Sequence, residues 1–168
     1  MMYYFNIDNK DAILEDGHDV PSRGGLRATG WDLWAEMMRY PDRFEPEYFK
    51  YYSCVATIDC ETLNEAFHLT NSEEDFANSY YGKVTPLTGN GSFPSMSVGD
   101  IVLIGSIYPG TNALYDGKFF MCAMVGWTEL KELNESRAES MAKTEALRAE
   151  ILADCEYESN LNIGERNG

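Results

Sequence analysis

The spacing of apolar residues predicts an amphipathic helix early in the chain. Trp31 and Trp34 fall on one face of a helix that ends before Pro41. Thr29 and Asp32 form a short-side-chain version of the capping box, which satisfies backbone donors at a helix start. A glycine pair, Gly24-Gly25, and a proline, Pro21, precede Thr29, so the preceding segment is expected to be a loop.

Strands are predicted where β-branched and aromatic residues concentrate. Four segments have this composition: residues 3–7, 52–58, 101–107 and 118–125. The last two are joined through Pro109-Gly110 and Asp116-Gly117, which are turn dipeptides, so they predict a hairpin with a long loop. A second helix is expected from a cap at Asp59 to a stop at Asn71.

Three further segments differ in character. Residues 40–52 place two prolines among six aromatic residues, which breaks an α-helix and indicates an ordered connection. Residues 72–95 are polar and contain several glycines, as in an exposed loop. Residues 128–158 favour helix almost throughout, and residues 159–168 are expected to fray.

Together these elements predict a single α+β domain over residues 1–158. Its expected core is a β-α-β-β unit over residues 52–130, in which a small antiparallel sheet of three or more strands packs against helices. Residues 1–50 are expected as an N-terminal extension with a Trp- and Met-rich helix, and residues 129–158 as a long C-terminal helix. A chain of 168 residues has the size of one domain.

The formal charge of -15 restricts the classes of partner. It argues against direct binding to nucleic acid, because proteins that bind a phosphate backbone concentrate Lys and Arg on one face. A basic protein is a better match. Four cysteines without C-x-x-C spacing indicate reduced thiols, and the first residues lack the features of a signal peptide or membrane helix. We therefore expect a cytoplasmic protein with no membrane partner.

The stretch PSMSVGDIVLI, from Pro94 to Ile104, raises the question of a phosphate-binding loop. Such loops need several glycines at a helix start, often with a lysine. This stretch has one glycine and no lysine, and a predicted strand follows Asp100. We interpret it as a tight turn in which Gly99 and Asp100 lead the chain into that strand.

The same residues carry a resemblance to a known family. The run Ser95-Met96-Ser97-Val98-Gly99-Asp100-Ile101-Val102, with Gly126-Trp127 and Leu130 after the next strand, resembles the YodL-like domain of phage and plasmid proteins. The helix that ends at Asn71, followed by Asp75-Phe76, is similar to the helix before the serine turn of that family. The resemblance covers residues 52–130. It implies an accessory protein of a phage or other mobile element, acting inside a bacterium, and no catalytic residues.

Residues with catalytic or metal-binding chemistry are few. Cys54, Cys60, Cys122 and His68 contain the atoms of a zinc site or of a Cys-His nucleophilic pair. Structural zinc usually draws on closely spaced ligand pairs, which these residues do not form, and a free cysteine is often simply buried. We therefore assign no catalytic, metal-binding or cofactor-binding residues and expect no cofactor.

Contact with a partner protein is expected on two surfaces. The aromatic segment has the composition of a binding hot spot, although core packing uses the same residues. The acidic C-terminal helix either imitates the phosphates of DNA, together with acids from elsewhere in the fold, or serves solubility alone. The candidate partner-binding residues are Tyr40, Arg43, Phe44, Tyr48, Phe49, Glu139, Glu145, Glu150 and Asp154.

These observations predict a non-catalytic, phage-encoded accessory protein that binds and modulates a host protein in the host cytoplasm. In its sharper form, the hypothesis is inhibition of a nucleic-acid-directed defence factor, a basic protein, through the acidic surface. Two alternatives stay open. One is a virion or assembly protein that forms homo-oligomers, and the other is a cytosolic hydrolase.

Overall fold

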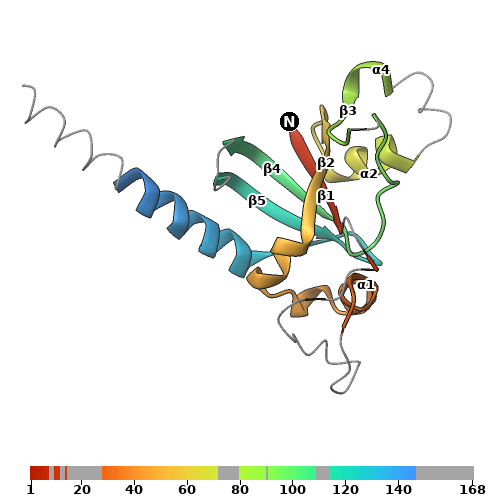
Figure 1. Cartoon of the computed structure of the whole chain (residues 1–168). Coiled ribbons are helices and arrows are strands. Elements are labelled where there is room, and N and C mark those ends of the chain that lie inside the picture. The colour runs from red at the N-terminus through yellow and green to blue at the C-terminus, as the bar shows by residue number, and fades with distance from the viewer. Residues whose placement is uncertain are drawn as a thin grey trace, which may run out of the picture.

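An antiparallel sheet forms the centre of the molecule (Figure 1). The computed structural model describes residues 1–7, 10, 11, 14, 28–71, 80–89, 91–108 and 114–146. Within them the sheet has six strands in the order β3-β2-β1-β4-β5-β6. The strands are β1 (Met2–Ile7), β2 (Tyr52–Ile58), β3 (Val84–Pro86), β4 (Ile101–Tyr108), β5 (Leu114–Cys122) and β6 (Trp127–Glu129). Helices pack against this sheet, which confirms the expected α+β class.

The helical elements are mostly short. They are α1 (Gly30–Arg39), the 3-10 helices η2 (Pro41–Arg43) and η3 (Pro46–Tyr51), α2 (Leu63–Asn71), α4 (Tyr80–Lys83) and a C-terminal helix described over residues 131–146. The expected cap of α1 is present, because the backbone N–H and the hydroxyl of Thr29 both donate to the Asp32 carboxylate, at 2.8 and 2.9 Å. In η2 and η3 the prolines of the aromatic segment begin 3-10 turns, as expected of a segment that cannot continue an α-helix.

Apolar side chains form two cores, one on each face of the sheet. Strand β1 contributes to both, because successive side chains of a strand point to opposite faces. Phe5 and Ile7 pack in the first core with α1, η3 and the start of the C-terminal helix, whereas Met2 and Tyr4 pack in the second core with α2. Burial on both faces explains why β1 is an apolar run with little polar alternation.

Aromatic rings fill the middle of the first core. Phe49 of η3 packs against Phe5 and Phe119, with ring centroids 5.2 and 4.9 Å apart, in tilted and edge-to-face arrangements. The guanidinium of Arg137 lies over the rings of Phe49 and Tyr115, at 5.2 and 5.4 Å from their centroids. The C-terminal helix is thereby attached to the sheet through its first turns.

Beyond those first turns the C-terminal helix leaves the sheet. Figure 1 shows it running away from the strands. Leu133 is fully buried, whereas most residues from 138 to 146 are exposed. This exposure agrees with the thin apolar stripe in the sequence. No helix in the described part of the chain combines the length and the apolar character needed to cross a membrane.

Residues 1–50 are more than an extension of the domain. Strand β1 lies between β2 and β4 in the middle of the sheet, and it pairs Met2 with both Ile58 and Ile104. The segment expected as a 72–95 loop also contains a strand, β3, which pairs with β2. The chain therefore uses its first strand as the centre around which the other strands assemble.

Three expected local features differ in the structure: one turn, one helix start and one helix cap. Asp116-Gly117 lies inside β5 instead of in the hairpin turn, because Gly117 faces Gly105 of β4 across an unusually close backbone approach. Thr128, expected as the start of a helix, belongs to the short strand β6. Helix α2 is capped by the Thr62 hydroxyl, which accepts the N–H of Glu65 at 3.1 Å, and not by Asp59. The parts of the chain expected as the end of the long helix and as a frayed tail, residues 147–168, lie outside the described residues.

Candidate functional site

Asp100, the aspartate of the serine turn, is fully buried in a polar network. Its carboxylate accepts hydrogen bonds from the Tyr4 hydroxyl (2.9 Å), the Asn6 side-chain amide (2.9 Å) and the backbone N–H of Ser97 (2.7 Å). The N–H of Asp100 donates to the Ser97 carbonyl at 3.0 Å and closes the turn. The motif therefore fixes the turn before β4 to the central strand β1, as the turn interpretation of this stretch expects.

Burial changes the acidity of this network. It raises the pKa of Asp100 to about 6, although the hydrogen bonds oppose the shift by favouring the carboxylate. Burial also raises the pKa of Tyr4 and Tyr52, and the nearby Asp100 charge adds to both shifts. The Tyr52 hydroxyl donates to the Gly99 carbonyl at 3.0 Å. Because Asp100 has no exposed surface, the network holds the turn and gives a substrate no access to the carboxylate.

The thiols in the described residues are weak nucleophiles. Burial raises the pKa of Cys54, Cys60 and Cys122 to about 11 in each case, so they are protonated at neutral pH. His68, their imagined partner, is exposed on α2. Among the described residues, no group of three His, Cys, Asp or Glu side chains is placed to hold a metal ion.

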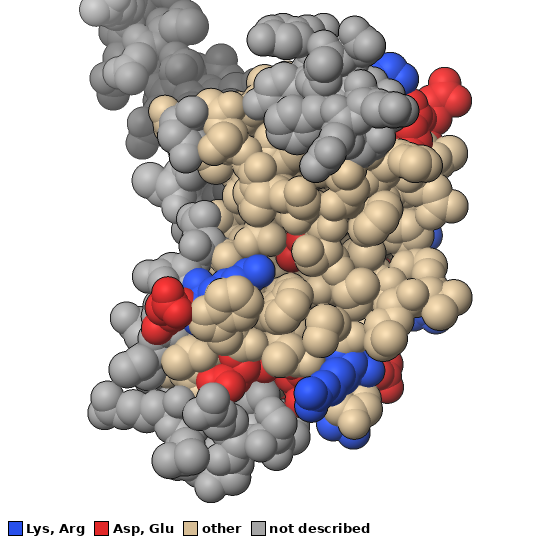
Figure 2. Space-filling model, turned by 90° about the vertical axis from the view of Figure 1, so that its right-hand side faces the viewer, with Lys and Arg blue, Asp and Glu red and all other residues tan. Residues whose placement is uncertain are grey.

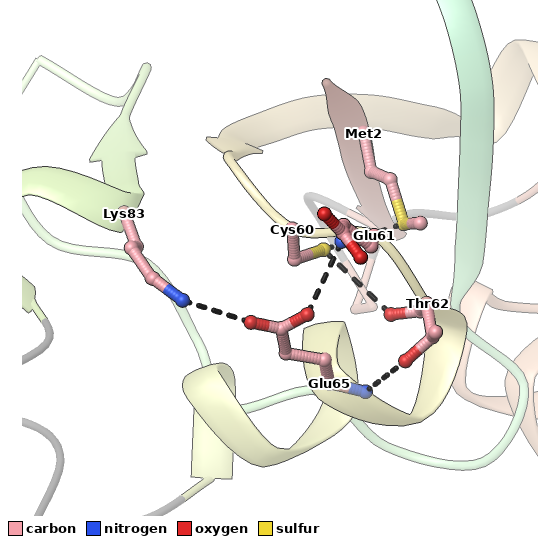
Figure 3. A network of polar contacts seen from close by, with 6 residues as sticks. All are labelled: Met2, Cys60, Glu61, Thr62, Glu65 and Lys83. Atoms are coloured by element: carbon pink, nitrogen blue, oxygen red, sulfur yellow. Dashed lines mark hydrogen bonds and ion pairs between the residues drawn. The ribbon is translucent and has the colours of Figure 1, made fainter.

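Cys60 lies in a network that connects β1, the start of α2 and the end of α4 (Figure 3). Its sulfur contacts the Met2 sulfur at 3.5 Å and the Thr62 carbonyl oxygen at 3.7 Å. Beside it, the Lys83 ammonium pairs with the Glu65 carboxylate at 2.8 Å. This ion pair lowers the pKa of Glu65 and raises that of Lys83. The network fastens the start of α2 to the edge of the sheet.

The structure divides the aromatic segment between the core and the surface. Phe49 is 3% exposed and belongs to the first core, so it is not available to a partner. Phe44 and Tyr48 are also buried but line a surface hollow. Tyr40 is exposed, and the Arg43 guanidinium lies 4.0 Å from the centroid of its ring.

The candidate residues on the C-terminal helix are less concentrated. Glu139 and Glu145 are exposed on the part of the helix that leaves the sheet. Glu150 and Asp154 lie outside the described residues. The described part of the helix has four exposed glutamates, which are Glu132, Glu135, Glu139 and Glu145.

The first of two hollows lies between α1, the 3-10 helices and the C-terminal helix. It has a volume of about 330 Å³. It is lined by Glu36, Met37, Asp42, Arg43, Phe44, Glu45, Tyr48 and Glu132. Glu36 is almost fully buried on α1, and its carboxylate pairs with the Arg43 guanidinium at 3.0 Å. Because Arg43 also lies over Tyr40, its side chain is held at the rim of the hollow from two sides.

A second hollow of about 400 Å³ adjoins the first, and both are lined by Asp42, Phe44 and Glu132. The remaining lining residues of the second hollow come from η2, β6 and the start of the C-terminal helix. We call the two hollows together the acidic groove. Their lining combines apolar side chains, such as Phe44 and Met37, with several carboxylates and two cations, Arg43 and Lys131.

Three carboxylates of the acidic groove have no ion-pair partner among the described residues. They are Asp42, Glu45 and Glu132, in contrast to Glu36, which pairs with Arg43. Burial raises the pKa of Tyr48, and the charge of Glu45 adds to this shift. The acidic groove is therefore a region of negative potential above a partly apolar floor.

Sequence reasoning found one half of this site. Arg43, Phe44 and Tyr48 were expected as contact residues, whereas the carboxylates around them were missed. The missed residues are Glu36, Asp42, Glu45 and Glu132. One signal was present, since Glu36 lies next to Met37 on the buried side of α1, where a carboxylate needs a partner.

No protein-family model, curated protein or solved structure matches this chain.

Proposed function

We propose that this chain is a non-catalytic binding protein that takes a basic segment of a partner protein into the acidic groove. The observation that carries the proposal is the group of Asp42, Glu45 and Glu132 around the buried ring of Phe44, three carboxylates that have no ion-pair partner among the described residues. A carboxylate in a hollow is a strong acceptor for an Arg or Lys side chain.

The groove fits the two parts of a basic side chain. The aliphatic stem of Lys or Arg packs on apolar surface while the charged end stays near solvent. Met37 and Phe44 offer the apolar surface, and the carboxylates meet the charged end. Arg43, held by Glu36 and Tyr40, keeps its positive charge at the rim and selects against segments that place a cation there.

The biological setting of the proposal comes from the resemblance of residues 52–130 and from the charge. We propose a phage-encoded accessory protein that modulates a host protein in the host cytoplasm. Proteins that bind nucleic acid concentrate basic residues on one face, so a nucleic-acid-directed defence factor has the chemistry that the groove takes. Occupying that basic face would inhibit the factor, because the bound chain would cover the surface that contacts nucleic acid.

The test uses a labelled arginine-rich peptide and its counterpart with glutamine in place of arginine. The test variant combines Asp42→Asn, Glu45→Gln and Glu132→Gln. The matched control removes three exposed carboxylates from the C-terminal helix through Glu135→Gln, Glu139→Gln and Glu145→Gln. Fluorescence anisotropy then gives the dissociation constants at about 0.05 M salt, where screening of charges is weak, and at about 0.5 M salt, where it is strong.

We expect the groove variant to bind the arginine peptide about 30-fold more weakly, because three exposed charge contacts contribute about 2 kcal/mol together. The helix variant should bind within about threefold of the unmodified protein, and high salt should weaken all binding. Equal losses in both variants would mean that overall charge, and not the groove, attracts the peptide. Equal binding of the glutamine peptide would refute recognition of basic side chains.

The proposed modulation of a host protein is tested by a separate experiment. Tagged protein is used to capture partners from a bacterial lysate, in parallel with the groove variant. The proposal expects a basic nucleic-acid-binding protein that is captured at low salt, released at high salt and absent with the variant. Capture that does not depend on the groove residues would contradict it.

A further inference from the structure

The turn between β5 and β6 exposes apolar side chains. Met124 and Val125 at its tip are 79% and 93% exposed. Phe67 on the neighbouring helix α2 is 39% exposed. Water contact of several large apolar side chains in one place is typical of an interaction surface.

A hollow lies directly beside this tip. It has a volume of about 230 Å³. Its lining comes from α2, the serine turn and the β5–β6 turn: Asn64, Phe67, Val98, Cys122, Ala123, Met124, Gly126 and Trp127. One wall is fixed, because the indole N–H of Trp127 donates to the Asn64 side-chain oxygen at 3.0 Å. None of these residues carries a charge, and none of them lines the acidic groove.

Two stretches that line the hollow carry no charge. The serine turn, residues 95–99, and the stretch 119–128 contain no Lys, Arg, Asp or Glu, and they line the hollow through Val98 and through the β5–β6 turn. Figure 2, which views the molecule from the side of α2, shows a broad area almost without charged side chains between charged groups at its upper right and lower ends. We call this area the uncharged face. Its distinguishing apolar residues are Phe67, Val98, Met124, Val125 and Trp127.

We infer that the uncharged face binds a second copy of this chain, with the β5–β6 tip of each copy in the hollow of the other. Two molecules with a charge of -15 repel one another wherever their carboxylates approach. Contact through a hollow whose lining residues are uncharged brings fewer carboxylates together than contact elsewhere, and charges separated by more than about 10 Å near 0.1 M salt are largely screened. A basic partner, in contrast, is attracted most strongly to the carboxylates, which this face lacks.

The shape of the face also suits a pair of identical molecules. A two-fold contact requires one surface to be complementary to itself. A protruding tip immediately beside a hollow meets this requirement, because a rotation of one copy by half a turn places tip against hollow twice. The acidic groove stays free in such a dimer, which then offers two grooves to one partner.

The inference is tested by measuring molar mass in sedimentation equilibrium from about 1 μM to about 1 mM protein, the range of weak and moderate self-association. The unmodified protein is compared with Val125→Asp, whose site is almost fully exposed, so the substitution does not disturb the core. The control is Leu87→Asp, which adds the same charge at another exposed apolar residue outside the hollow. Each protein is measured at about 0.05 M and about 0.5 M salt.

We expect a dimer whose dissociation constant falls at high salt, because screening weakens the remaining repulsion. Val125→Asp should weaken it about tenfold or more, since the two-fold axis brings two new like charges into the contact. Leu87→Asp should change it by less than about threefold. A monomer at all concentrations, or equal effects of both substitutions, would overturn the inference. High salt should weaken binding of the arginine peptide to the groove but strengthen the dimer. The two proposals are therefore tested separately, and the failure of one does not affect the test of the other.

Discussion

Replacing Asp100 with asparagine tests whether the titration of this buried carboxyl makes the free energy of unfolding depend on pH. Asp100 accepts hydrogen bonds from Tyr4, Asn6 and the Ser97 N–H, and it is fully buried. Asparagine keeps the size of the side chain but cannot be ionised, and its amide brings a donor among groups that are already donors. Asp100→Asn therefore removes both the titration and at least one hydrogen bond.

The magnitude follows from the shift of the Asp100 pKa, which burial raises from 3.8 to about 6. A carboxyl whose pKa is raised on folding stabilises the native state in its protonated form. Its contribution is complete below pH 3.8 and is lost as the pH rises through about 6. Two pKa units correspond to about 3 kcal/mol in total, of which about 1.3 kcal/mol is expressed between pH 5 and pH 7.

The assay is urea unfolding followed by tryptophan fluorescence at several pH values from about 5 to about 7.5, a range above the sequence pI of about 4.4. The free energy of unfolding of Asp100→Asn is subtracted from that of the unmodified protein at each pH. Other groups titrate in both proteins and cancel. Asp59→Asn, at an exposed carboxylate, supplies the baseline for the loss of one acid.

We expect this difference to shift by about 1.3 kcal/mol in favour of the unmodified protein as the pH falls from 7 to 5. The absolute value at pH 7 depends on the lost hydrogen bond, which costs about 1–3 kcal/mol, and on the relieved burial of a charge. A difference that is constant with pH would show that Asp100 titrates alike in the folded and unfolded states. A shift in the opposite direction would show that its hydrogen bonds outweigh its burial.

Two further predictions concern the backbone and the thiols. Gly105→Ala should lower the free energy of unfolding by at least about 3 kcal/mol, because the new Cβ would lie 2.0 Å from a backbone carbonyl oxygen of β5. Gly89→Ala, where no heavy atom lies within 4 Å, should change it by less than about 0.5 kcal/mol in the same urea titration, and equal effects would contradict the close approach. Burial raises the pKa of Cys122 to about 11, so its reaction with a disulfide reagent should be slow at neutral pH and accelerate about tenfold per pH unit up to pH 9. Fast labelling at neutral pH, compared with urea-unfolded protein, would contradict the protonated thiol.

Local features of the fold were predictable from the sequence. The helix after Thr29 and its capping box depend on residues three positions apart, and the strand after Asp100 depends on a turn motif and an aliphatic run. Such elements follow from short-range preferences. Strands β4 and β5 and the hairpin that they form were therefore predicted, with ends displaced by a few residues.

Features that depend on distant residues were not predictable in the same way. Strand β1 was recognised as a strand, but its central position depends on pairing with residues far along the chain. The strand character of Asp116-Gly117 depends on Gly105 of the facing strand, and the dipeptide alone indicates a turn. The short strand β3 contains three residues, too few for a periodic pattern.

The acidic groove illustrates the same limit at the level of the site. Its carboxylates come from α1, from the segment around η2 and η3, and from the C-terminal helix. Only the folded chain shows that Glu36 is neutralised by Arg43 whereas Asp42, Glu45 and Glu132 form no ion pair within the described part of the chain. Composition indicated an acidic protein, and the aromatic segment indicated a contact region. Only the tertiary structure shows that carboxylates and aromatic residues line the same groove.

The central place of β1 also sets the order of events during synthesis. Its residues leave the ribosome before either neighbouring strand exists, and its second neighbour, β4, begins only at Ile101. Until then one edge of an apolar strand has no hydrogen-bonding partner in the sheet, and such edges attract other chains. Long-range pairing of this kind slows folding, because the intervening chain must be ordered first. Nascent chains of this protein are thus exposed to chaperones and to aggregation until β4 has been made.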